Sequence, residues 1–273
     1  MRNKKILILS LFIIAFFIVV AILAPYLTPY NPDIQSGLPF ETPSSKHLLG
    51  ANHIGQDIFS EIIMGTRYSI YIGFLVASLT ISIGSFLGII SGYFGGIIDS
   101  VIMRICDFIM TIPYFPMVIL LASVSSGGVP TMVFILTALS WPHSARVIRS
   151  QVMKIKTKDY ILNIKAMGAK NTYILRKHIL RKLSPLIAYR FTTRFKYAII
   201  AESTLSFLGL GSPTIKSWGS ILYFAQQRNA FTIGAWPWWV IPPGILISIL
   251  AFSLMLFSYS FEEIMDKRLK GDN

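Results

Sequence analysis

The chain has 273 residues, of which 53% are hydrophobic and only 14% charged, with 25 Lys and Arg against 12 Asp and Glu. Because a soluble chain is about one-quarter charged, this composition and a mean hydropathy of +0.62 indicate a membrane protein and exclude a disordered or collagen-like one. The net charge of +13 leaves nucleic acid open as a partner until the charges are placed along the chain. The single cysteine, Cys106, excludes an intrachain disulfide, and the four scattered histidines show no zinc-site spacing, so no metal site is predicted.

Six long apolar segments each have the length of a membrane span. At about 1.5 Å of rise per residue, each can cross a hydrocarbon core of about 30 Å. We therefore predict an all-α integral membrane protein with a single transmembrane domain over residues 1–273. The predicted spans are residues 6–26, 70–92, 100–123, 129–149, 187–211 and 237–260.

The first predicted span follows Arg2, Lys4 and Lys5, a pattern that is also typical of a secretory signal peptide. The apolar run from Ile6 to Ala24 is longer than the roughly 7 to 15 residues of a signal-peptide core, and no A-x-A cleavage site follows it. We therefore predict a span that is not cleaved off.

Small residues recur along the second predicted span. Gly84, Gly88 and Gly92 are four apart, and Gly73 and Ala77 precede them on another turn. Where Cβ atoms are absent, a neighbouring helix can approach closely, which is how membrane helices gain van der Waals contact. The pattern predicts a multi-helix bundle and names no function.

The basic residues are concentrated in alternate loops. Between Arg146 and Lys196 there are 14 basic residues and one acidic residue, Asp159, so this stretch carries the whole net charge of +13. The positive-inside rule then places both termini and residues 150–186 in the cytoplasm, and the loops 27–69 and 212–236 outside. We expect a multi-pass protein of the cell membrane, in contact with lipid, and no longer expect nucleic acid as a partner.

Few charged residues lie inside the predicted spans, and such residues are functional candidates because their burial in lipid is costly. Arg104 and Asp107 are three apart on a helix, so we favour a structural ion pair over a conduction site. Glu202 has no obvious local partner. A substrate or gating contact and a bond to a backbone amide or a neighbouring subunit both stay open for it. These three residues are the candidate pathway or gating residues.

The cytoplasmic segment 150–186 is predicted to contain two short helices around a glycine. Residues 158–167 are compatible with a helix, Gly168 can end it with a positive φ, and Asn171 can cap a second helix. Pro185 is expected to end that second helix before the fifth span. With Ile and Leu exposed among the lysines, the element is predicted to dock a protein partner. The alternatives are a lipid-surface helix and, less favoured because no binding motif is present, a nucleic-acid patch.

Five blocks of sequence resemble one protein family. The stretch DYILNIKAMGAKNTYILRKHILRKLSPLI resembles the EAA loop of bacterial ABC importer permeases. The other blocks occur in matching order and resemble the dipeptide, oligopeptide and nickel branch, in particular the C-type subunit of its heterodimeric permease pair. They are HLLGANHIGQDIFSEIIMGTRYSI (47–70), GIISGYFGGIIDSVIMRICDFIMTIP (88–113), AESTLSFLGLGSPTIKSWGSIL (201–222) and the PPG that follows PWWV (237–244).

The resemblance implies a type I ABC importer permease fold with six transmembrane helices and cytoplasmic coupling helices. The chain would form half of the pathway for a di- or oligopeptide, and it would pair with a homologous permease, two cytoplasmic ATPases and an extracellular solute-binding protein. ATP and Mg²⁺ would be used by the ATPases, with no cofactor bound by this chain. It is not itself expected to be an enzyme, because it contains no Gly-Lys dipeptide and hence no Walker A loop.

Two alternatives remain beside that function. The same fold could import nickel or another metal chelate, and His47 and His53 lie on an outer loop, although the sequence does not decide the substrate. A stand-alone secondary transporter or channel with Glu202 as its ion site would be expected to contain inverted repeats, and none is convincing here.

By the resemblance, the coupling helices would sit in a groove of the ATPase. The chain departs from the family pattern at Leu162, Asn163 and Ile164, where Glu-Ala-Ala is usual, and no role is carried over for the missing glutamate. It also has Ser258-Tyr259 and Asp266-Lys267-Arg268 where Gly-Asp and Asp-Pro-Arg are usual. The predicted ATPase-coupling residues are Tyr160, Lys165, Ala166, Gly168, Ala169, Lys170, Asn171 and His178.

Overall fold

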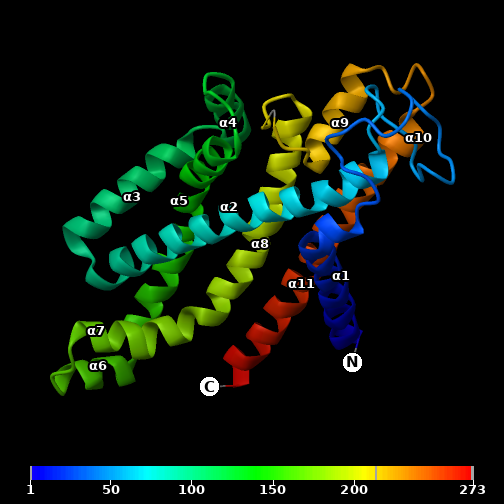
Figure 1. The fold of residues 1–273 in the computed structure, drawn as a ribbon. Coiled ribbons are helices and arrows are strands. Elements are labelled where there is room, and N and C mark those ends of the chain that lie inside the picture. Colours follow the sequence, from blue (N-terminus) through cyan, green and yellow to red (C-terminus); the bar gives the residue numbers. More distant parts are fainter. Residues whose placement is uncertain (1, 213, 272–273) are drawn as a thin grey trace.

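The computed structural model describes residues 2–212 and 214–271, and these form a helical bundle (Figure 1). Within these ranges the only β-pairing is an isolated bridge between Ala51 and Asp57. The all-α prediction therefore agrees with the described structure. The helices are α1 (Arg2–Leu27), α2 (Ile58–Phe94), α3 (Gly96–Thr111), α4 (Tyr114–Ser123), α5 (Val129–Lys156), α6 (Asp159–Ala166), α7 (Asn171–Tyr173), the π-helical turn η1 (Ile174–Ile179), α8 (Leu180–Phe207), α9 (Trp218–Gln227), α10 (Trp236–Trp239) and α11 (Ile241–Gly271).

Each of the six predicted spans overlaps a helix, but length and composition single out fewer of them as membrane-crossing. Lys5–Leu27, Ile58–Phe94 and Trp236–Glu262 are long and apolar enough, and the bent pair α3 and α4 counts as a fourth if it forms one span. The helices α5 and α8 have 28 residues each, about 42 Å, so they are long enough to cross although they are more polar. The count of six spans therefore stays a prediction.

The third predicted span, 100–123, is not one straight helix. The helices α3 and α4 meet at an angle of 83°. Between them Ile112 is extended, with φ −83° and ψ 129°, and Pro113 follows. Proline lacks an N–H and disfavours the helical conformation in the residue before it, so the break occurs at this dipeptide.

The helix α2 begins well before the predicted start at residue 70. The carboxylate of Asp57 accepts a hydrogen bond from the backbone N–H of Ser60 at 2.8 Å and so caps the helix at Ile58. The predicted loop 27–69 is thus helical from Ile58 onward, and the predicted loop 212–236 contains α9. With 37 residues, α2 is about 55 Å long, which exceeds the thickness of a hydrocarbon core.

The glycine pattern of α2 lets α5 pack closely against it. A Cβ atom at Gly84 would lie 2.7 Å from Ser144 Cβ, and one at Gly88 would lie 2.5 Å from the carbonyl oxygen of Ala145. At Gly92 the distance to Val152 Cβ would be 2.8 Å. These distances are too short for real side-chain carbons, so the prediction of close helix packing at these glycines is confirmed.

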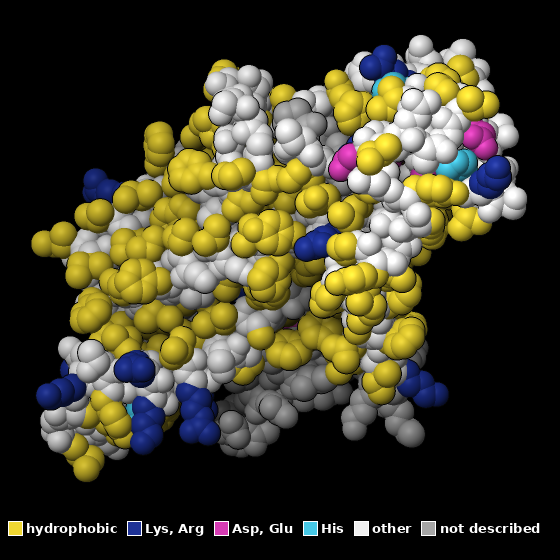
Figure 2. Space-filling model, in the orientation of Figure 1, with side chains coloured by type: hydrophobic (Ala, Val, Ile, Leu, Met, Phe, Trp, Pro, Cys, Tyr) yellow, Lys and Arg dark blue, Asp and Glu magenta, His cyan; other side chains and the backbone are white. Residues whose placement is uncertain are grey.

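Four apolar clusters lie within the described bundle, and two of them join its long helices. One core lies between α2, α4, α5 and α8 and includes Val76, Val118 and Leu136. The other joins α1, α2, α8 and α11 and includes Phe17 and Leu250. On the face in Figure 2, hydrophobic side chains cover the middle, and most Lys and Arg side chains gather at the lower end around α6 and α7 and at the upper right. The apolar band between two charged ends is what a membrane protein requires.

Candidate functional site

The turn between α6 and the next helix is built around Gly168. Its φ is +84°, a left-handed conformation that glycine adopts without steric cost, as predicted. The N–H of Gly168 donates to Lys165 O at 3.0 Å, and the N–H of Ala169 donates to Ile164 O at 3.3 Å. This pair of bonds is a Schellman motif, which satisfies the last carbonyls of α6 and fixes the direction in which the chain leaves it.

Asn171 does not cap the second helix, so that prediction is wrong. The N-cap position is Lys170, which makes no side-chain capping bond, and Asn171 is the first helical residue. The side chain of Asn171 instead accepts a hydrogen bond from the hydroxyl of Tyr93 at 2.8 Å. Since Tyr93 lies at the end of α2, this bond ties the turn to the long helix.

Pro185 does not end the second helix either. It lies inside α8, and α7, η1 and α8 follow one another without a gap from Asn171 to Phe207. Proline cannot donate to the carbonyl of Arg181 four residues earlier, but the hydroxyl of Ser184 donates to that oxygen at 2.9 Å. The side chain thus replaces the missing backbone bond, and the helix continues.

None of the isoleucines of the coupling segment, residues 150–186, is exposed, and three of them are fully buried. Ile161, Ile174 and Ile179 form an apolar cluster with Ile148 and Val152 of α5. The prediction that isoleucine is exposed in this segment is therefore wrong. The predicted exposure of leucine is confirmed at Leu162, which is 50% accessible, and at Leu180. The other exposed large apolar side chains of the segment are Met153, Tyr160, Met167 and Tyr173.

His178 lies between the two coupling helices. Its ring centroid is 6.3 Å from that of Tyr160 on α6 and 5.6 Å from that of Tyr173 on α7. The structure thus brings the rings of Tyr160 and His178 near each other, and their coupling role stays a prediction. The side chains of Lys165, Ala166 and Lys170 are exposed on the outside of the turn.

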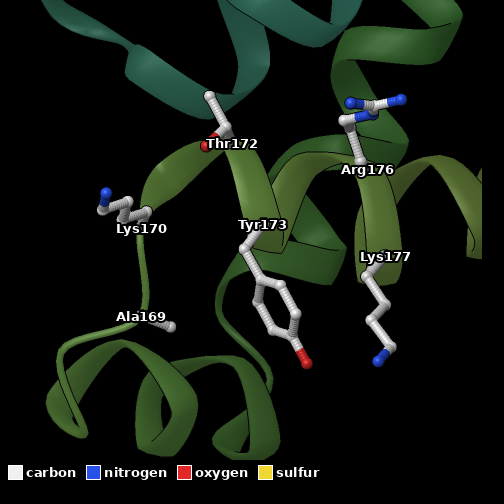
Figure 3. Close-up of a pocket in the computed structure, with 6 residues that line it drawn as sticks. All are labelled: Ala169, Lys170, Thr172, Tyr173, Arg176 and Lys177. Atoms are coloured by element: carbon white, nitrogen blue, oxygen red, sulfur yellow. The ribbon is translucent and has the colours of Figure 1, made fainter.

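A shallow pocket of about 580 Å³ opens beside this turn (Figure 3). In the close-up, the side chains of Tyr173 and Lys177 extend in the same direction, toward the level of Ala169, whereas Arg176 extends the opposite way. The ammonium group of Lys177 lies 5.3 Å from the centre of the Tyr173 ring, within the range of a cation–π interaction. No acidic residue lines the pocket. Its lining residues are Ala169, Lys170, Thr172, Tyr173, Arg176 and Lys177.

Two candidate pathway residues on α3 do not pair with each other. Asp107 forms its ion pair with Arg146 of α5 instead of Arg104, so the predicted pair is wrong. One end of α3 is held in the same way, because Asp99 accepts two hydrogen bonds from Arg149 at 2.5 Å. Spacing within α3 could not reveal these partners, since both belong to a neighbouring helix.

Glu202 has local partners that the sequence reasoning overlooked. Its carboxylate accepts hydrogen bonds from Ser206 at 2.8 Å and from Ser203 at 3.3 Å. The residue is 0% accessible. Ser206 lies one helical turn further along α8, so the spacing of four was the signal that could have identified it. The enclosed position favours a structural role over contact with a moving substrate.

The two histidines of the first loop have separate environments. His47 Nδ1 lies 2.9 Å from a carboxylate oxygen of Asp57, whereas His53 stacks on Phe224 and Trp239. Burial, with smaller effects of Arg228 and Lys216, lowers the pKa of His53 below its usual value. In the part of the chain that the structure describes, no three His, Cys, Asp or Glu side chains are placed to hold a metal ion.

Lys216 joins three separate segments at this end of the molecule, a role that the sequence analysis missed. Its ammonium group donates to the carbonyl oxygen of Pro32 and to Gln56 Oε1, both at 2.5 Å, and lies 2.7 Å from Glu61 Oε1. Asn52 also donates to Glu61, at 2.8 Å. The network ties the first loop to the start of α2 and to the segment before α9.

The chain matches two protein families. The family described as "Binding-protein-dependent transport system inner membrane component" matches residues 84–271, and "N-terminal TM domain of oligopeptide transport permease C" matches residues 1–46. The first match contains the coupling segment and the three candidate pathway residues. The second covers the first predicted span.

Similar curated proteins extend over nearly the whole chain. The dipeptide transport system permease protein DppC of Bacillus subtilis is 34% identical over 99% of this chain and 84% of its own length. The oligopeptide transport system permease protein OppC of the same organism is 34% identical over 98% of this chain and 88% of its own length. The glutathione transport system permease protein GsiD of Pectobacterium atrosepticum is 34% identical over 93% of this chain and 84% of its own length. The chain therefore belongs to the family of binding-protein-dependent transport system inner membrane components.

Proposed function

We propose that this chain forms one half of the membrane pathway of an ATP-driven importer for short peptides. The similar permeases are named for dipeptide, oligopeptide and glutathione transport, which supports a peptide substrate over a metal chelate. A homologous permease completes the pathway, and a solute-binding protein delivers the substrate outside. Two ATPases use ATP and Mg²⁺ in the cytoplasm, so this chain is a pore subunit and not the enzyme.

The proposed topology has six spans and cytoplasmic termini. The helices α5 and α8 serve as the fourth and fifth spans, and some of their polar side chains, such as Ser144 and Glu202, are buried within the bundle. The two chain ends lie toward the same end of the bundle as α6 and α7 (Figure 1), which supports a shared cytoplasmic side. In this topology, the apolar side chains that cover the middle of the face in Figure 2 would contact the lipid.

One observation carries the coupling role: the second coupling helix is continuous with α8. From Asn171 to Phe207 the chain stays helical through α7, η1 and α8, and Ser184 bridges the position of Pro185. The same segment packs against α5 through Ile174 and Ile179. A displacement of the docked turn therefore moves the membrane part of α8 as one body, with no flexible linker to absorb it.

Charge reversal on the docking turn tests this role. We expect the double variant Lys165→Glu and Lys170→Glu to abolish peptide-stimulated ATP hydrolysis by the full complex in proteoliposomes, while the chain stays in the membrane. Both side chains are exposed, so folding should not change. Lys46→Glu is the matched control, because this exposed lysine lies in the first loop. Normal stimulated hydrolysis in the double variant would exclude the docking assignment.

A stand-alone secondary transporter or channel is the competing function from another class. It requires that the purified chain alone moves substrate across a liposome membrane without ATPases. The enclosure of Glu202 by two serines argues against an ion site there. Peptide uptake by liposomes that contain this chain alone would overturn the importer assignment, and uptake that needs both permeases, both ATPases and ATP would support it.

A further inference from the structure

A cavity of about 660 Å³ lies between α2, α3, α4, α5 and α8. This volume falls within the range of about 300 to 1,000 Å³ that is typical of small-molecule sites. Most of the lining is apolar, with Val76, Met117 and Leu139 among its side chains. A few polar groups interrupt these walls: Thr80, Tyr114, Ser140, His143, Arg194 and Tyr197.

The charged group of this cavity lies at the middle of its helix. Arg194 is the fifteenth of the 28 residues of α8, and His143 is the fifteenth of the 28 residues of α5. In the predicted spans 187–211 and 129–149, Arg194 and His143 lie seven and six residues, or about 10 Å, inside the cytoplasmic end. A cation at such depth is costly unless it serves a function or meets an anion.

Arg194 has no anionic partner within the described chain. Arg190 lies four residues earlier on the same helix, so two like charges are neighbours. Glu262 of α11 acts electrostatically on Arg190, but its carboxylate accepts a hydrogen bond from Tyr189. Among the side chains that the structure describes, no carboxylate lies within ion-pair distance of either guanidinium group. The carboxylates of the surrounding helices already have partners: Asp99, Asp107 and Glu202.

A second donor accompanies the guanidinium group. The hydroxyl of Ser140 donates to the oxygen of Tyr114 at 3.3 Å, which leaves the hydroxyl hydrogen of Tyr114 free to bond elsewhere. The planar guanidinium group presents two parallel N–H donors, a geometry that matches the two oxygens of a carboxylate. The cavity thus offers a carboxylate a cation and a hydroxyl donor beside apolar walls.

We propose that this cavity is a subsite of the transport pathway in which Arg194 and Tyr114 bind the C-terminal carboxylate of the peptide. Every unmodified peptide carries this group whatever its sequence, so one fixed cation can serve many substrates. The apolar walls accept the side chains without a specific bond. This inference rests on the proposed importer function and deepens it.

The test compares free peptides with their C-terminal amides. Proteoliposomes containing the full complex are given an equimolar pool of synthetic di- to pentapeptides and the matching amides, and the imported molecules are counted by mass spectrometry. The measured quantity is the ratio of imported acids to amides, divided by the same ratio for the Arg194→Gln variant. Any preference of the solute-binding protein is identical in both preparations and cancels in this quotient.

We expect a quotient of about ten or more, since a hydrogen-bonded charge pair is worth at least this factor. Tyr114→Phe should also lower the acid-to-amide ratio. This variant replaces Arg194→Gln in the test if Arg194→Gln does not fold. Lys196→Gln is the matched control: this cation is two residues away on α8, lies over the ring of Tyr197 at 4.6 Å, and does not line the cavity. The ratio should be unchanged in this variant.

Three results would overturn the inference. A quotient near one in an assembled, transporting complex would show that the guanidinium group does not select carboxylates. Loss of the second permease from purified Arg194→Gln complexes would show that an acidic side chain of that subunit occupies the cavity. If the wild-type and Arg194→Gln complexes retain different amounts of phospholipid while the ratio of imported acids to amides is the same, the site binds a lipid phosphate. Absence of any uptake by the wild-type complex would instead overturn the proposed function itself.

Discussion

Substitution of Gly168 tests whether the coupling turn depends on its backbone conformation or on side-chain packing. No heavy atom lies within 4 Å of a Cβ atom placed at this glycine, so a side chain there meets open space. The cost of substitution is therefore conformational, because φ is +84°. The left-handed conformation costs a residue with a Cβ atom about 1 to 2 kcal/mol, and it costs asparagine less because asparagine adopts this conformation more readily.

We expect Gly168→Ala to weaken ATPase binding by about 5- to 30-fold, the factor that corresponds to 1 to 2 kcal/mol. Gly168→Asn should weaken it less, although asparagine is the larger residue. The assay is a titration of fluorescent ATPase subunits onto the permease pair in nanodiscs, followed by the rate of peptide-stimulated ATP hydrolysis. If the loss follows side-chain size, so that alanine is milder than asparagine, the conformational reasoning is refuted.

Two further substitutions test the packing and the loop network. Gly88→Leu should lower the stability of the purified chain by about 1 to 3 kcal/mol or more, because its Cβ would lie 2.5 Å from the carbonyl oxygen of Ala145. Thermal unfolding in detergent measures this, and Gly244→Leu is the control, since a Cβ there meets nothing within 4 Å. Lys216→Met should destabilise the chain by about 3 kcal/mol, because it leaves the buried carboxylate of Glu61 without its cation. Adding Glu61→Gln should restore much of the loss, and an equally unstable double variant would contradict the assigned pairing.

Two features that depend on one helix were predicted correctly from the sequence. The coupling turn at Gly168 followed from the need for a positive φ between two short helical stretches. The glycines at positions 84, 88 and 92 followed from their spacing of four, which indicates that a helix packs there without identifying the helix. In both cases the determining interactions lie within one turn or along one face.

Features that depend on neighbouring helices were not predictable. The pairing of Asp107 with Arg146 requires knowledge that α3 lies beside α5, and spacing alone suggested Arg104 instead. Proline was ambiguous for a different reason, which is local to the chain. Pro113 breaks the chain between α3 and α4, whereas Pro185 is accommodated because the hydroxyl of Ser184 satisfies the exposed carbonyl. The cavity around Arg194 needs several helices, so no single stretch of sequence could reveal it.

The unbroken helix that leads from the coupling turn into α8 has a consequence for the length of the coupling segment. Residues of an α-helix advance by about 100° each, so deleting one residue between Leu180 and Arg190 would rotate the rest of α8 relative to the turn by about that angle. Arg194 would then leave its cavity, and Glu202 would turn away from the environment that encloses it. The number of residues between the proposed ATPase contact and the proposed pathway therefore sets the orientation of the pathway side chains about the helix axis, whatever those residues are.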